Sequence, residues 1–271
     1  MKNTRLPILA LLASVGLFSL SGCEFLSGIV KGTGKGEASE GLGELVAGTL
    51  ERLAQRDVVV NGNTVSYGDH RYSVVCELDP ASREFKLPTA AVSFSNFPSS
   101  DVEFAAVYES LLGKSLAGTV AMVPMAIELF ARDAEMGRRG FELLCSDAAI
   151  AARVVERLQA RLSLSHDVHE EGCSCQRYMA AALLKGASDT NGYLPENPYT
   201  VEMTMAPGGV KDAAHACGKL TSTYILSLGW DAFQRGVDVF RPEDSEYYKI
   251  LDCTSCCFWC KDIQGVWAGL Q

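Results

Sequence analysis

The residues with the clearest chemistry are cysteines and histidines, and the densest group of cysteines lies near the end of the chain. Two C-x-x-C units stand back to back there, at Cys253, Cys256, Cys257 and Cys260. Such units hold zinc or act as redox centres in cytosolic proteins, and they pair as structural disulfides in exported proteins. The compartment that the chain reaches therefore decides between these chemistries.

A second group combines both residue types in the middle of the chain, at His166, His169, Cys173 and Cys175. Imidazole and thiolate ligands together suit zinc or copper. The stretch has the composition of an exposed loop, and other thiols compete for its cysteines. We treat a zinc or copper site there as an alternative to disulfide formation, and we expect no other cofactor.

The amino terminus bears on the compartment. A short cationic segment is followed by an apolar run that ends in Leu20-Ser21-Gly22-Cys23. This arrangement resembles the signal peptide and lipobox of bacterial lipoproteins. The resemblance implies that residues 1–22 are removed and that Cys23 is lipidated. Because Glu24 rather than Asp follows Cys23, it also implies an outer-membrane anchor, with the folded part in the periplasm.

Composition excludes one class of partner. The chain has 271 residues and a formal net charge of −9, and removal of residues 1–22 leaves 22 basic and 33 acidic residues, a charge of −11. No basic stripe is present, so we expect no nucleic-acid partner. The expected partners are the membrane, through the lipid on Cys23, and another protein of the cell envelope.

In an oxidising compartment, disulfides are the default state of paired cysteines. With Cys23 lipidated, nine of the ten cysteines remain. We expect the C-terminal cluster to be joined to the Cys173 region, a bridge between Cys76 and Cys145 to be possible, and Cys217 to stay unpaired. The disulfide candidates are Cys76, Cys145, Cys173, Cys175, Cys253, Cys256, Cys257 and Cys260.

The chain is divided by composition into a signal peptide, a glycine-rich tether over residues 23–41 and one domain over residues 42–271. The expected fold class is α+β and mainly helical, with a small N-terminal antiparallel sheet packed on helices and a disulfide-stapled C-terminal region. The domain divides into a β-rich part (57–96), a helical part (100–165), a Cys-rich loop (166–175) and a helical part with the Cys cluster (176–271).

Local signals support parts of this architecture. Asn61-Gly62-Asn63 is a turn signal between two short apolar strands, and residues 71–78 and 89–95 read as further strands. Ser100 and Glu103 have the spacing of a helix capping box. An apolar run over 115–130 predicts a buried helix, kinked or restarted at Pro124. Ser146 is expected to cap the next helix, and further helices are expected over 176–185, 211–228 and 242–251.

No familiar hydrolase motif stands in a fitting context, and we nominate no catalytic residue. His70 and His215 are interpreted as structural or surface residues. The leading hypothesis is a non-enzymatic envelope lipoprotein that acts as a scaffold or binds a protein partner. The alternative is a metal-binding lipoprotein, and the third hypothesis is a thiol–disulfide oxidoreductase that uses Cys257 and Cys260.

Overall fold

A computed structural model describes residues 58–78, 89–162, 179–212, 219–227 and 235–257. The chain divides into two units, Met1–Leu53 and Ala54–Gln271, and every described residue belongs to the second unit. The predicted signal peptide and tether, and the predicted helix near residues 42–56, lie outside the described residues.

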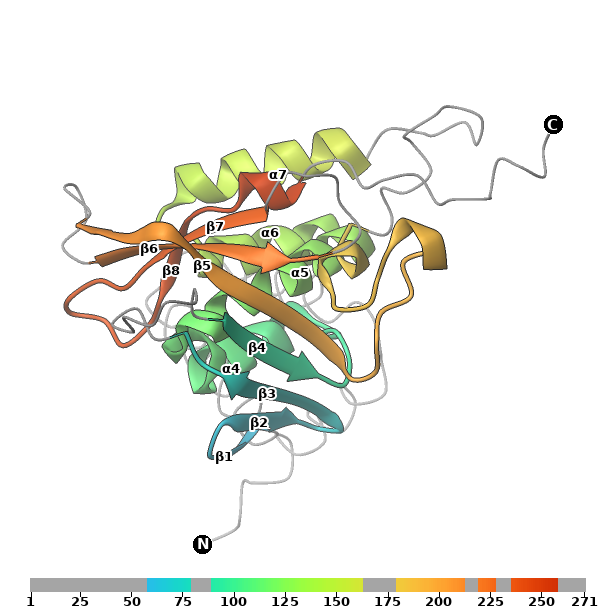
Figure 1. Cartoon of the computed structure of the whole chain (residues 1–271). Helices are drawn as coiled ribbons and strands as arrows, with labels where there is room; N and C mark the ends of the chain where they lie inside the picture. The colour runs from blue at the N-terminus through green and yellow to red at the C-terminus, as the bar shows by residue number, and fades with distance from the viewer. Residues whose placement is uncertain (1–57, 79–88, 163–178, 213–218, 228–234, 258–271) are drawn as a thin grey trace, which may run out of the picture. The chain divides into compact units, whose positions relative to one another are not determined.

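Among the described residues, eight strands form one antiparallel sheet in which each strand pairs with the next along the chain (Figure 1). The strands are β1 (Val58–Asn61), β2 (Thr64–Tyr67), β3 (His70–Cys76), β4 (Thr89–Phe94), β5 (Tyr199–Asp212), β6 (Lys219–Leu226), β7 (Arg235–Phe240) and β8 (Lys249–Asp252). Antiparallel neighbours can be joined by tight hairpins, as β1, β2 and β3 are, whereas all four described α-helices lie in the connection from β4 to β5.

The first three strands follow the local turn signals. Asn61 pairs with Thr64 and Tyr67 with His70, so each hairpin has a two-residue loop. Gly62 and Gly68 occupy the first loop positions with φ of +60° and +54°. Glycine adopts these angles without strain, as the first position of a type II′ turn requires. The predicted N-terminal strands, including the one at 89–95, are confirmed.

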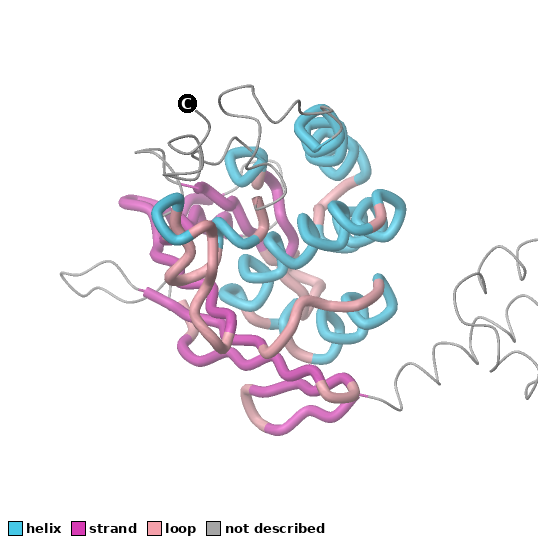
Figure 2. The backbone as a smooth tube through the Cα atoms, turned by 90° about the vertical axis from the view of Figure 1, so that its right-hand side faces the viewer, coloured by secondary structure: helices cyan, strands magenta, loops and turns pink. Residues whose placement is uncertain are grey.

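The four described α-helices lie together on one side of the sheet (Figure 2). The strands alternate accordingly: in β5, Val201 and Met203 are fully buried while Thr200 and Glu202 are partly exposed. The helices are α4 (Asp101–Ser110), α5 (Leu116–Arg132), α6 (Ala134–Leu144) and α7 (Ala148–Leu162), with 3₁₀ helices η1 (Leu112–Lys114), η3 (Ala181–Leu183), η4 (Asp189–Asn191) and η5 (Thr254–Cys257).

Helix α5 is the centre of this layer, as its apolar composition predicts. It is continuous through Pro124, so the predicted restart at that residue is wrong. Its N-terminus is capped by the Ser115 hydroxyl and by Glu77, whose carboxylate accepts from the backbone N–H of Ala117 at 2.8 Å. A carboxylate at this end also complements the helix dipole. The end of β3 is thereby tied to the central helix.

The cap of α7 differs from the prediction. The Asp147 carboxylate, not the Ser146 hydroxyl, accepts from the N–H of Ile150 at 2.9 Å. One side of this helix packs on the core, since Ala151, Val154 and Leu158 are buried.

The predicted fold class is wrong in two respects: the proportion of helix to strand, and the extent of the sheet, which has eight strands among the described residues and is not limited to the N-terminal part. The described strands contain as many residues as the described α-helices, so the domain is not mainly helical. Strand β6 falls inside the helix predicted over 211–228, and β8 overlaps the end of the helix predicted over 242–251. The predicted helix over 176–185 contains only the short η3 in its described part. Long-range pairing with β5 and β7 determines these segments.

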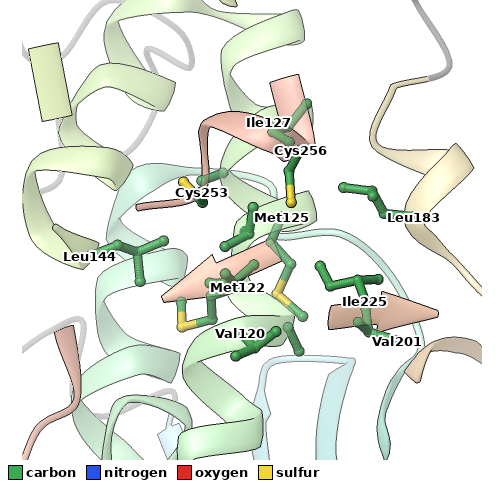
Figure 3. Close-up of a cluster of buried hydrophobic side chains, with 14 of the residues drawn as sticks. Val120, Met122, Met125, Ile127, Leu144, Leu183, Val201, Ile225, Cys253 and Cys256 are labelled. Carbon is green, nitrogen blue, oxygen red and sulfur yellow. The ribbon is translucent and has the colours of Figure 1, made fainter. Parts of the chain in front are cut away.

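The predicted disulfide staples are also absent from the described residues. Cys145, Cys253, Cys256 and Cys257 are buried free thiols, and Cys76 is an exposed one. Figure 3 shows Cys253 and Cys256 among core side chains such as Met125 and Ile127 of α5. A buried thiol packs as a small apolar side chain. Packing and backbone hydrogen bonds, rather than the expected staples, hold the described C-terminal segment.

Candidate functional site

The two edges of the sheet differ in how the chain treats them. The outer side of β8, here called the closed edge, is covered by the chain itself. Cys145 forms a parallel bridge with Ile250, and the Ser146 N–H donates to the Ile250 carbonyl at 2.9 Å. The segment that joins α6 to α7 thus pairs with β8 at Ile250.

Side chains reinforce this closure. Lys249 Nζ donates to the Leu143 carbonyl at 2.6 Å, near the C-terminal end of α6. The Tyr108 hydroxyl donates to the Tyr248 carbonyl at 2.7 Å. A cation is stabilised at a helix C-terminus, where the unpaired carbonyls carry partial negative charge. The closed edge is therefore bound to the ends of α4 and α6.

The outer side of β1, here called the open edge, lacks such cover among the described residues, because no described strand pairs with it. Pairs in an antiparallel ladder alternate between hydrogen-bonded and non-hydrogen-bonded. Asn61 and Thr64 close a two-residue hairpin, so Asn61 and Val59 direct their backbone groups to β2. Val58 and Val60 consequently direct their N–H and C=O groups outward.

The side chains of the open edge are apolar and exposed. Val59 is 61% exposed and Val60 is 49% exposed, and β1 as described carries no charge. Proteins commonly protect an edge strand with charged residues, a bulge or a covering loop. Strand β1 is short, which limits its reach, but none of those protections is present among the described residues. The open edge has the features of a strand that can accept another strand.

Strand β3, two strands in from the open edge, is fastened to α4 by a buried carboxylate. Glu103 is only 1% exposed. Its Oε1 lies 2.7 Å from His70 Nδ1 and accepts from the Tyr72 hydroxyl at 2.7 Å. Its Oε2 accepts from the Ser99 N–H and hydroxyl, each at 2.7 Å. Both carboxylate oxygens therefore have two partners. We call these four residues the Glu103 cluster.

Hydrogen bonding outweighs desolvation in this cluster. Burial alone raises the pKa of Glu103, but the bonds from Ser99, Tyr72 and His70 hold it below its ordinary value. Burial raises the pKa of Tyr72 above its ordinary value, and the adjacent Glu103 raises it further. A fully bonded carboxylate of this kind joins structural elements. His70 therefore has a structural partner, in agreement with its interpretation from the sequence.

The predicted capping box at this helix is half confirmed. The Glu103 N–H donates to the Ser100 hydroxyl at 3.1 Å, as the motif requires. The Glu103 carboxylate, however, bonds to Ser99 and the hairpin instead of returning to the backbone of Ser100. The partner His70 is 33 residues away, so spacing within the motif could not reveal it.

The buried thiols are poorly suited to nucleophilic chemistry. Burial raises the pKa of Cys145 and of Cys256 to about 12 in each case. Burial also raises the pKa of Cys253 and Cys257 well above the ordinary thiol value. Reactive cysteines have lowered pKa values and partial exposure. Cys257, the candidate redox nucleophile, has neither property.

The remaining candidate residues lie outside the described residues, and the structure places none of them. These are Cys23, His166, His169, Cys173, Cys175, His215, Cys217 and Cys260. Within the described ranges, no three His, Cys, Asp or Glu side chains gather closely enough to hold a metal ion. None of the helices in those ranges has the length and apolar character needed to cross a membrane.

Sequence reasoning placed β1 correctly but missed its position at an edge of the sheet. The available signal was the position of β1 in the chain: it is the first strand after the predicted tether, and two tight hairpins join it to β2 and β2 to β3. Strand order within a sheet, however, depends on the pairing of distant segments. The exposure of Val59 and Val60 follows from that order and not from their hydropathy.

Comparison with known proteins adds a family but no function. Residues 96–264 match a family described as a domain of unknown function, DUF6935. No curated protein and no solved structure matches the chain. The matched segment begins after β4 and includes Glu103 and the four buried cysteines, whereas β1 to β4 lie before it. The chain belongs to the DUF6935 family of domains of unknown function.

Proposed function

We propose that this protein is a lipid-anchored protein of the cell envelope that binds a protein partner through the open edge of its sheet and carries out no chemical reaction. The observation that carries the proposal is the contrast between the edges: β8 is covered by the chain, and β1 presents exposed, uncharged valines. The lipobox-like segment ending at Cys23 supports the anchor, with the lipid in the outer membrane and the domain in the periplasm.

The described side chains that could do chemistry are committed to structure, which supports a binding role. Glu103 has four hydrogen-bond partners, and the thiols of the core are buried with raised pKa values. A strand that joins an open edge gains main-chain hydrogen bonds, and its side chains gain apolar contacts. The open edge offers both kinds of contact at Val58, Val59 and Val60.

The anchor is tested by the intact mass of the full chain purified from membranes. We expect cleavage before Cys23 and a mass increment of two or three acyl chains, lost in Cys23→Ser together with membrane association. The binding role is tested in the same cells with a photo-crosslinking amino acid at position 59 or at position 75. Val75 is the control because it is a valine of similar exposure, 62%, that lies on β3 and not on the open edge.

The expected result is a defined crosslinked species from position 59 and none from position 75. Crosslinks of equal yield at both positions, or none from position 59, would contradict the binding role. An uncleaved chain without lipid would contradict the anchor, whatever the crosslinks show.

A further inference from the structure

We infer that the partner at the open edge is the β1 strand of a second copy of the same protein. The inference rests on the proposed function and names the partner of the same edge. A pair of identical open strands can join antiparallel about a twofold axis, which makes the same patch complementary to itself. Closed symmetric dimers of this kind are the commonest soluble assemblies.

The alternation within β1 selects one register. Val58 and Val60 both direct their N–H and C=O groups outward, so Val58 of one copy pairs with Val60 of the other and both bonds of each such pair form. The twofold axis then passes between the two Val59 residues. These side chains, 61% exposed in one copy, face each other across the join.

If the partner is a second copy, charge favours contact between the two β1 strands over contact between other surfaces. The chain carries a formal net charge of −9, so most surfaces of two copies repel each other. Strand β1 contains only Val58, Val59, Val60 and Asn61, which are uncharged. The strand of a second copy therefore meets no like charge directly across the join.

The short strand also predicts that the dimer is weak in solution. A standard interface buries about 800 Å² on each partner, and a four-residue strand offers much less. Confinement of lipidated copies to one membrane raises their effective concentration and compensates for weak contacts. We therefore expect self-association of the anchored chain at surface densities where the unanchored chain is monomeric in solution.

The test uses lipidated full-length chains labelled with a donor or an acceptor fluorophore and reconstituted together in phospholipid vesicles. We expect energy transfer that rises with surface density beyond the level for random mixing. Val59→Lys should weaken this association at least about tenfold, because two lysines face each other at the twofold axis. Val75→Lys, with the same change at a similarly exposed valine on an inner strand, should leave it unchanged.

A second pair of variants tests the register and controls for misfolding. Val59→Glu copies should also fail to associate with one another, but a mixture of Val59→Lys and Val59→Glu copies should regain energy transfer. Misfolding in either variant would not produce this rescue.

Random-mixing transfer at every density, or equal loss with Val75→Lys, would overturn the inference. Failure of the dimer is distinguishable from failure of the proposed function. If position 59 crosslinks in cells to a different protein while vesicles show no self-association, the binding role stands and the second copy is excluded. If the chain carries no lipid, the mass measurement reports it separately.

Discussion

Among the described residues, the two edges of the sheet differ in their contacts with the rest of the chain. At β8, the Ser146 N–H and the Lys249 ammonium connect the strand to the end of α6, and the Tyr108 hydroxyl connects the preceding residue to α4. At β1, the described chain supplies no such contact to the outward groups of Val58 and Val60. The described helices thus contact one edge of the sheet and leave the outward backbone groups of the other uncovered. This contrast is the basis of the proposal that the open edge binds a partner.

The edges also differ in what holds them to the helices. The closed edge joins the apolar core, where Ile250 is fully buried beside Cys253 and Val239. Toward the other edge of the sheet, Glu103 joins β3 to the first turn of α4 through its bonds with His70 and Tyr72, and Val65 of β2 is buried in the core. The attachment of β3 to α4 therefore includes one buried charge.

The largest effect is expected from removal of the buried carboxylate. Glu103→Ala leaves the Tyr72 hydroxyl and the Ser99 N–H without their acceptor, and should lower the free energy of unfolding by about 3–5 kcal/mol. Urea titration of the purified domain measures this. Glu142→Ala is the control, since Glu142 is a surface residue paired with Arg138, and should cost about 0–1 kcal/mol. Equal stability of the two variants would show that the cluster does not fasten β3.

The next effect contrasts one residue from each edge. Ile250→Ala removes a fully buried side chain from the closed edge and should cost about 2–5 kcal/mol. Val59→Ala removes an exposed side chain from the open edge and should change the stability by at most about 0.5 kcal/mol. Both are measured by thermal or urea unfolding of detergent-dispersed monomer. A large loss with Val59→Ala would mean that the open edge is covered within one copy.

A smaller effect is expected at the turn that forms the open hairpin. Gly62→Ala should cost about 1–2 kcal/mol, because an L-residue is strained at φ of +60°. An added Cβ meets no atom within 4 Å, so strain alone accounts for the loss. Gly236→Ala on β7 is the control: its φ is not positive, and its Cβ would make only ordinary contacts. A loss at Gly236 as large as at Gly62 would contradict this explanation.

The smallest effect is expected from a change in pH, and it should appear only in acid. Because the pKa of Glu103 is lower in the folded state than its ordinary value of 4.5, its stabilising contribution is present above that value and is lost as the pH falls through the folded pKa. The difference in unfolding free energy between the wild type and Glu103→Gln should therefore shrink below a pH of about 4.5. A difference that grows in acid would contradict the assigned charge state.

Local signals in the sequence predicted the N-terminal part of the sheet well. Gly62 and Gly68 follow strand residues directly, and tight hairpins depend on such local residues. The Ser100 cap and the burial of α5 were predicted for the same reason. These features depend on residues that are close in the sequence.

The strands after β5 could not be read in the same way. The Ala-rich run over 213–217 suggested a helix that extends over β6, although Thr221, Thr223 and Ile225 alternate inward as a strand requires. Val237 and Val239 show the same alternation in β7 and were not assigned. Pairing with β5 decides these segments, and that pairing is long-range. The open edge escaped prediction because edge position is a property of the whole sheet.

Amide hydrogen exchange at the two edges tests the central claim most directly. In detergent-dispersed monomer, the Val58 and Val60 N–H groups should exchange rapidly, while the Ser146 N–H, bonded to Ile250 across the closed edge, should be protected. In vesicles at high surface density, Val58 and Val60 should become protected and Ser146 should not change. Protection of Val58 and Val60 already in the monomer would contradict the account, because it would show that the chain closes both of its edges.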